Sequence, residues 1–135
     1  MPQRTDDPTI DNDDWLWRRI RNRPQWYAQN PDGSYRLSSV TFLDTYTNEV
    51  SVDQAKLTTR ETALRLDQDD GLAQIKAGFP RSLQHLVTAD PEPDNPAHAL
   101  ICPPPTLSQG QRKSSARLMA QAAEWLVMPK SLRND

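Results

Sequence analysis

The sequence has few of the residues from which disulfides, thiolate zinc sites and phosphate-binding loops are built. Its 135 residues include one cysteine, four glycines and two histidines. A single cysteine, Cys102, excludes an intramolecular disulfide and a cysteine-based zinc site, and it fits a reducing compartment. The four glycines lie far apart in the chain, so they form no glycine-rich phosphate loop.

Long apolar runs are missing as well. No run approaches the roughly 20 residues of a membrane span, and the first residues lack the apolar core of a signal peptide. We therefore expect a cytoplasmic protein without a membrane partner. The net charge of −2 creates no overall field for a polyanion, so direct nucleic-acid binding is not expected.

The residues that are present suit one globular domain. A chain of this length with 36% hydrophobic residues has room for a single core. Residues 1–12 and 129–135 are polar, and we expect them to be tails of a domain that spans residues 13–128. Twelve prolines predict several stiff connections, of which residues 90–96 are the clearest.

Several segments have the pattern of β-strands. Residues 35–43 are rich in β-branched and aromatic residues, and residues 49–53 alternate, with Val50 and Val52 on one face. Residues 44–48 between them are expected to form a hairpin loop. Two short strands are expected within residues 72–87, the second near residues 84–88, and an apolar strand at residues 98–102. Residues 15–20 fit a helix and a strand equally well.

Two helices complete the predicted fold. One begins at Thr58 or Thr59 and ends near residues 69–71, and a longer one covers residues 108–127. The apolar face of the longer helix is expected to contain Leu118, Ala122 and Trp125, with Met119, Ala123 and Leu126 beside them. This order predicts an α+β fold. We expect a mostly antiparallel sheet of four or five strands, with helices on one face and a long C-terminal helix.

No catalytic or metal-binding constellation stands out. His98, at the start of an apolar strand, suits a general base, a phosphate ligand or a structural histidine, and we expect the structural role. His85 is expected to be half-exposed. Cys102 should be a buried, inert thiol, since on a strand it lies about 13 Å from His98. We therefore predict no catalytic residue, no metal site and no cofactor.

The best candidate for a function is a mixture of arginine and aromatic side chains near the N-terminus. Arginine and tryptophan dominate interface hot spots, and the same mixture can stack on nucleotide bases. The alternative is that the tryptophans are core residues and the arginines a solvated face. The predicted partner-binding residues are Trp17, Arg18, Arg19, Arg21, Arg23, Trp26 and Tyr27.

Three segments resemble the landmarks of a family of small uncharacterised bacterial proteins. They are residues 36–42 (RLSSVTF), 50–53 (VSVD) and 95–101 (NPAHALI). The resemblance covers roughly residues 13–128 and implies no activity. It makes a small set of positions the first candidates for ligand binding: Arg36, Ser38, Ser39, Asp53 and His98.

A second resemblance is to ADP-ribosyltransferase-like domains. These domains open with a strand that carries arginine or histidine, here residues 17–20, and continue with a serine-containing strand, here residues 38–42. Their catalytic glutamate is expected late, ahead of a strand. This chain offers Glu92, in a proline-rich connection, and Glu124, within the expected helix.

These observations predict a non-enzymatic accessory or regulatory interaction subunit of a bacterial multi-protein complex, bound to a larger protein partner. The alternative is a small nucleotide- or nucleic-acid-handling domain that uses Arg18, Arg19, Arg36 and His98. An ADP-ribosyltransferase-like activity is one form of this alternative.

Overall fold

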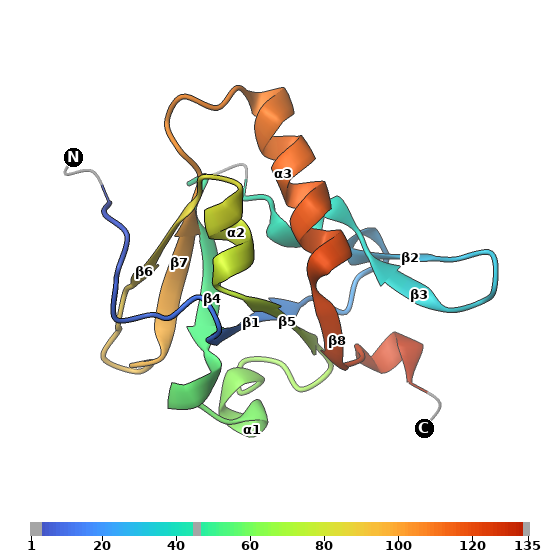
Figure 1. Cartoon of the computed structure of the whole chain (residues 1–135). Coiled ribbons are helices and arrows are strands. Elements are labelled where there is room, and N and C mark those ends of the chain that lie inside the picture. Colours follow the sequence, from blue (N-terminus) through green and yellow to red (C-terminus); the bar gives the residue numbers. More distant parts are fainter. Residues whose placement is uncertain (1–3, 45–46, 134–135) are drawn as a thin grey trace.

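The computed structural model describes residues 4–44 and 47–133, and its centre is a six-stranded antiparallel sheet (Figure 1). The strand order is β6-β7-β4-β1-β5-β8. These strands are β1 (Trp15–Ile20), β4 (Val50–Gln54), β5 (Gly71–Lys76), β6 (Leu86–Ala89), β7 (His98–Cys102) and β8 (Glu124–Val127). The α+β class and the antiparallel sheet are therefore confirmed, with more strands than expected.

The other elements are short apart from one helix. A separate two-stranded ribbon contains β2 (Tyr27–Gln29) and β3 (Tyr35–Leu37). The α-helices are α1 (Arg60–Ala63), α2 (Gly78–Ser82) and the long C-terminal α3 (Gln109–Ala122). The 3₁₀ turns are η1 (Pro24–Trp26), η2 (Ser39–Phe42), η3 (Ala55–Leu57) and η4 (Lys130–Leu132). None of the helices in the described residues is long and apolar enough to span a membrane.

The main core lies between one face of the sheet and helix α3. Alternate strand residues such as Leu16, Val52 and Ile101 point to this face, as the period of two requires. Ala116, Met119 and Ala120 of α3 cover them, and α2 packs beside α3 (Figure 1). The opposite face is largely open, and there the short α1 packs on Trp17 and Leu72 through Ala63 and Leu64.

Residues 15–20, which fit either a helix or a strand by sequence, form a central strand. β1 pairs with β4 through Leu16 and Trp17, and with β5 along its whole length. The strand predicted at residues 98–102 is also present, as β7. The alternation of Val50 and Val52 correctly indicates β4, since both side chains are buried. Thr59 caps α1 as expected, but that helix ends after one turn.

The strand expected over residues 35–43 is only partly correct. Its first three residues form β3, but residues 39–42 form the 3₁₀ turn η2. The local hydrogen bonds Thr41 N–H to Ser38 O and Leu43 N–H to Val40 O close this turn, and it packs against α3. In the hairpin loop predicted at residues 44–48, residues 45 and 46 lie outside the described part of the chain.

The helix predicted over residues 108–127 is too long. The side chain of Ser108 accepts a hydrogen bond from Gln111 N–H and caps the start of α3, while Ala123 is extended and ends it. Residues 124–127 then pair with β5 as strand β8. The predicted apolar face is only partly correct: Leu118 is 40% exposed, whereas Met119 is buried as expected, together with Ala116 and Ala120. Edge pairing with β5 evidently outweighs the helical pattern of Ala122 and Trp125.

Residues 1–12 and 129–135 are predicted from the sequence to be polar tails. In the structure, the described parts of both segments pack on the domain. Ile10 is 1% exposed, and Asp7 N–H donates to Val87 O of β6 at 2.9 Å. At the other end, Pro129 is buried and the Arg133 guanidinium donates to three backbone carbonyls. Local polarity did not reveal these contacts, because most of them are hydrogen bonds to distant backbone groups.

His85 is buried rather than half-exposed, with 5% of its surface accessible. Burial lowers its pKa, although the contact of Nδ1 with Leu83 O at 3.0 Å opposes this shift. As the pH falls, His85 therefore binds a proton at a higher pH in the unfolded chain than in the folded protein. Stability should be complete above the unfolded-state pKa of about 6.5 and should fall as the pH drops below it. His85→Gln should remove this loss, which urea unfolding of both proteins at pH 7.5 and 5.5 measures.

Cys102 agrees with the inert thiol predicted from its position. It is buried on β7, and burial together with the Glu49 carboxylate raises its pKa to about 12. Since only the thiolate is a good nucleophile, we expect native protein at pH 8 to react with a thiol reagent far more slowly than protein unfolded in urea. Equal rates in the two states would contradict this assignment.

Candidate functional site

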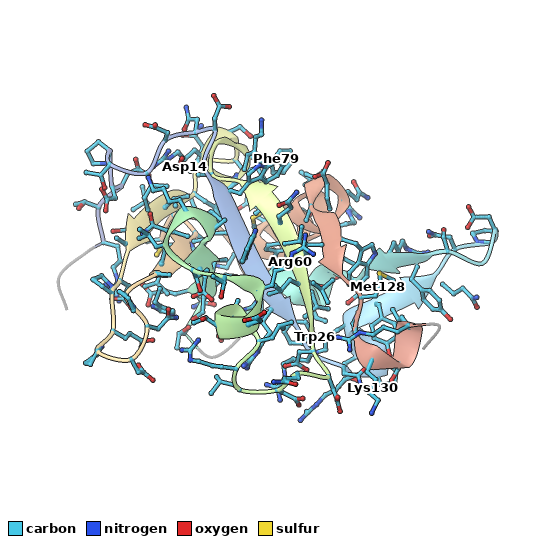
Figure 2. The ribbon with its side chains drawn as sticks, turned by 90° about the horizontal axis from the view of Figure 1, so that it is seen from below. Asp14, Trp26, Arg60, Phe79, Met128 and Lys130 are labelled. Atoms are coloured by element: carbon cyan, nitrogen blue, oxygen red, sulfur yellow. The ribbon has the colours of Figure 1, made fainter. Side chains whose placement is uncertain are left out.

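An open cavity of about 320 Å³ lies on the sheet face opposite the main core, beside α1. Figure 2 shows this side of the molecule, where Arg60 marks α1. We call this cavity the polar hollow, because most of its lining residues are charged or polar. They are Trp17, Arg18, Arg19, Ser51, Val52, Asp53, Ala63, Arg65, Leu66, Glu92, Asp94, Asn95 and His98.

Strand register explains why three of these residues meet. Trp17 of β1 lies opposite Asp53 of β4, and Asp53 lies opposite His98 of β7. Directly opposed residues in antiparallel strands have their side chains on the same face. Residues 17, 53 and 98 therefore form one row across three neighbouring strands, although more than thirty positions separate each from the next.

The loop between β6 and β7 supplies the acidic side of the hollow. Its base is held by Asp90 N–H donating to His98 O at 2.9 Å, and its tip by reciprocal hydrogen bonds between Glu92 and Asn95. Asn95 is buried and donates through Nδ2 to Asp53 Oδ1 at 2.8 Å. This bond fastens the loop to β4, so the carboxylates of the loop face the hollow from a defined backbone.

His98 uses one ring nitrogen within the protein. Nδ1 lies 3.0 Å from the backbone oxygen of Asp90, 3.1 Å from Asp90 Oδ2 and 3.9 Å from Glu92 Oε1. The other nitrogen, Nε2, makes no hydrogen bond to any residue that the structure describes. The backbone contact fits the structural role expected for His98, and the histidine also lines the hollow.

Arg18 lies where β1 and β4 separate. Its Nε donates to Thr41 O at 2.8 Å and its Nη1 to Ser51 O at 2.9 Å, and its guanidinium lies 5.3 Å from the centre of the Trp26 ring. Burial lowers the pKa of Arg18 to about 10. These contacts tie η2, β4 and η1 to β1. Arg18 is also among the residues that line the hollow.

Arg19 and Arg21 share one buried carboxylate. Nε of Arg19 lies 3.2 Å, and Nε of Arg21 3.6 Å, from Asp70 Oδ2, and the Asp70 side chain is only 2% exposed. The backbone N–H of Asn22 donates to the other oxygen of Asp70. Both arginines therefore stabilise the join between β1 and β5, and only Arg19 also lines the hollow.

The other predicted site residues lie elsewhere. Tyr27 packs edge-on against Tyr35 in the β2–β3 ribbon, where Arg36 donates to Asn30 Oδ1. Ser38 donates to Gln25 O at the start of η2. The exposed residues Arg23 and Ser39 do not line the hollow, and Trp26 contacts it only through Arg18. The structure thus brings together Trp17, Arg18, Arg19, Asp53 and His98.

Three residues of the hollow, Glu92, Asp94 and Asn95, belong to the proline-rich connection expected to be an extended surface segment, and the sequence offered Glu92 only as the glutamate of an ADP-ribosyltransferase-like domain. Five other lining residues were not predicted as site residues: Ser51, Val52, Ala63, Arg65 and Leu66. The sequence did contain one indication, the short segment between Asp90 and His98. A short loop that joins two antiparallel strands places its two end residues side by side. The buried indole N–H of Trp17, which has no partner among the described residues, could not be foreseen.

Comparison of the chain with protein-family models, with curated proteins and with solved structures found no match. The argument for function therefore depends on the geometry of the hollow.

Proposed function

We propose that the protein is a non-enzymatic accessory or regulatory subunit of a bacterial multi-protein complex, and that the polar hollow holds a polar segment of its larger partner. The observation that carries this proposal is the convergence of five predicted site residues, from three strands, on one open cavity. Such a cavity has the charged and aromatic lining that anchors a protruding segment of another protein.

The charges of the hollow favour a segment that carries both signs. Asp53, Glu92 and Asp94 lie on the side of the β6–β7 loop, and none of them forms an ion pair with a lysine or arginine among the described residues. Within the described part of the chain, Arg65 on the α1 side makes a backbone hydrogen bond to Thr62 O and no ion pair. Charges of both signs without ion-pair partners around one cavity give orientation and specificity to a bound segment.

An apolar contact is available at the rim. Leu66 lines the hollow and is 72% exposed, so its side chain is accessible to a bound segment. It lies beside Arg65, so an apolar side chain and a charged group of the partner can be bound together. A buried apolar contact ringed by polar groups is the usual composition of a protein interface.

A photo-crosslinking amino acid at position 66 tests the proposal. We expect the Leu66 variant, expressed in bacterial cells, to give a discrete adduct with one protein. The matched control places the same group at Leu118, which is 40% exposed on α3 over the other face. Arg65→Glu should suppress the adduct, because it reverses the charge of the wall facing the acidic loop.

Equal adducts from positions 66 and 118 would mean that the hollow is not the binding surface. If the adduct from position 66 persisted unchanged in the Arg65→Glu variant, the charge of Arg65 would not contribute to partner binding, and this part of the proposal would be wrong. Mass spectrometry of the adduct identifies the partner and the segment that enters the hollow.

The nucleotide-handling alternative is favoured by one observation. Glu92, which the sequence places in a proline-rich connection, lines the same hollow as Arg18, Arg19 and His98. An ADP-ribosyltransferase-like site needs a glutamate near an arginine-bearing strand. An NAD⁺-consumption assay with wild-type protein and the Glu92→Gln variant decides between the proposals. Consumption that is lost in the variant supports the transferase, and we expect no consumption.

Nucleic-acid binding is expected to be absent at physiological salt. The net charge is −2, and Arg18, Arg19 and Arg21 are held by carbonyls or by Asp70 rather than free for phosphates. A mobility-shift titration with mixed single- and double-stranded oligonucleotides measures this. Micromolar binding that weakens steeply with salt would indicate phosphate contacts and would favour the alternative.

A further inference from the structure

We propose that Asp90, Glu92 and His98 form a binding site for a divalent transition metal of the zinc class, at the acidic edge of the polar hollow. One ligand atom from each residue lies within 4.8 Å of the other two. The distances from His98 Nδ1 are 3.1 Å to Asp90 Oδ2 and 3.9 Å to Glu92 Oε1. This proposal is independent of the partner proposed above and departs from the expectation that the chain has no metal site.

The separations suit first-row metal coordination. Zinc binds imidazole nitrogen and carboxylate oxygen at about 2.0–2.2 Å, which places tetrahedral ligand atoms about 3.3–3.6 Å apart. The 3.1 Å pair is slightly closer than this and the 3.9 Å pair slightly farther apart. Rotations of the Asp90 and Glu92 side chains, which are 35% and 50% exposed, can adjust these separations.

The backbone that carries the three ligands is already fixed. Asp90 and His98 face each other at the base of the loop, joined by the hydrogen bond from Asp90 N–H to His98 O. Glu92 is held by its two backbone bonds to Asn95, whose side chain is bound to Asp53. Support of this kind keeps ligands in position before the metal arrives and raises its affinity.

The local charge favours a cation. With a neutral imidazole, the carboxylates of Asp90 and Glu92 converge on one ring nitrogen. The nearest cation is Arg4, whose Nη1 lies 3.6 Å from the other oxygen of Asp90 and whose Nε is bound to Glu49. A divalent ion would neutralise both converging carboxylates at once.

The ligand set selects the class of metal. One imidazole nitrogen with two carboxylate oxygens suits zinc and its neighbours, whereas calcium takes six to eight oxygens and magnesium keeps most of its waters. Nδ1 binds a metal only through its lone pair, so the imidazole proton must reside on Nε2, and the 3.0 Å contact of Nδ1 with the Asp90 backbone oxygen is then no longer a hydrogen bond. Nε2 has no hydrogen-bond partner among the described residues and is therefore able to carry this proton.

The site is tested by titrating the full-length protein with zinc. Binding is measured by calorimetry and by competition with a chromophoric chelator. We expect one zinc ion per chain with a dissociation constant of about 10 μM or lower, and a loss of at least about tenfold in affinity for Glu92→Gln. The matched control is Asp94→Asn, two residues away in the same loop, whose carboxylate forms no hydrogen bond or ion pair within the described structure. It should bind zinc like the wild type.

Zinc should also raise the melting temperature of the wild type and of the Asp94→Asn variant. The increase should be smaller for Glu92→Gln. A melting curve recorded without metal checks that the Glu92→Gln variant is folded. Equal zinc affinities of the Glu92→Gln and Asp94→Asn variants would overturn the site, as would a wild type that stays unloaded at about 100 μM zinc. Displacement of zinc by millimolar magnesium or calcium would refute the assignment of the metal class.

Discussion

Asp70→Ala should lower the free energy of unfolding by about 3 kcal/mol, because it leaves two arginines without their shared carboxylate. The Asp70 side chain is 2% exposed and lies 3.2 Å from Arg19 Nε and 3.6 Å from Arg21 Nε. It also accepts a hydrogen bond from Asn22 N–H, and that donor would be left unsatisfied. Urea unfolding monitored by tryptophan fluorescence measures the change.

The neighbouring residue provides the control. Asp69 is 53% exposed and its only ion pair is with Lys130, at 4.0 Å, so Asp69→Ala should change the stability by less than about 0.5 kcal/mol. If both substitutions had the same small effect, the Asp70 cluster would be a weak surface pair. Arg19 and Arg21 would then be free to act as partner contacts rather than structural residues.

Gly71→Ala should cost about 2 kcal/mol or more, since there is no space for a side chain where β5 meets the end of β8. An added Cβ would collide with the backbone oxygen of Val127 and come within 2.8 Å of the Pro129 ring. Both obstacles belong to rigid backbone or to a ring. The chain can make room only by moving β8 away from β5, which loses part of their pairing.

Gly110→Ala is the matched substitution without a collision. Gly110 lies in the first turn of α3, and no atom comes closer than 4.0 Å to its added Cβ. Alanine favours a helix over glycine by up to about 1 kcal/mol, so this variant should be as stable as the wild type or more stable. A Gly71→Ala protein with an unchanged urea midpoint would show that β8 is not fixed against β5.

The sequence was informative where local patterns decide the structure. Val50 and Val52 indicated β4, residues 98–102 indicated β7, and Thr59 and residues 108–122 indicated helices that the structure confirms. Each of these predictions depends on an apolar pattern with a period of two or near 3.6 residues, or on a capping residue. Such patterns act within a few neighbouring positions and need no knowledge of the fold.

The failures occurred where distant contacts decide. Residues 124–127 continue a helical pattern, but pairing with β5 makes them a strand. Residues 39–42 have strand-forming side chains and form a turn under α3. Asp70 lies in a polar stretch that predicts a loop, yet its carboxylate is buried by partners some fifty positions earlier.

The candidate site shows the same division. His98 and Asp53 were selected from short segments, and their side-by-side position follows only from the register of β4 and β7. Asp90 was not selected, and Glu92 was named only as a possible transferase glutamate, because their meeting with His98 depends on the closure of the β6–β7 loop. The sequence shows which residue types are present. Which of them lie close enough to form a site depends on the topology of the sheet and its loops.

The N-terminal segment covers the outer edge of β6. β6 is the last strand on its side of the sheet, and Asp6 and Asp7 bind the backbone groups of Val87 and Ala89 that a further strand would otherwise use. An uncovered strand edge recruits the edge of another molecule. A protein lacking residues 1–9 should therefore form dimers or larger aggregates through β6, even if each copy keeps its own fold.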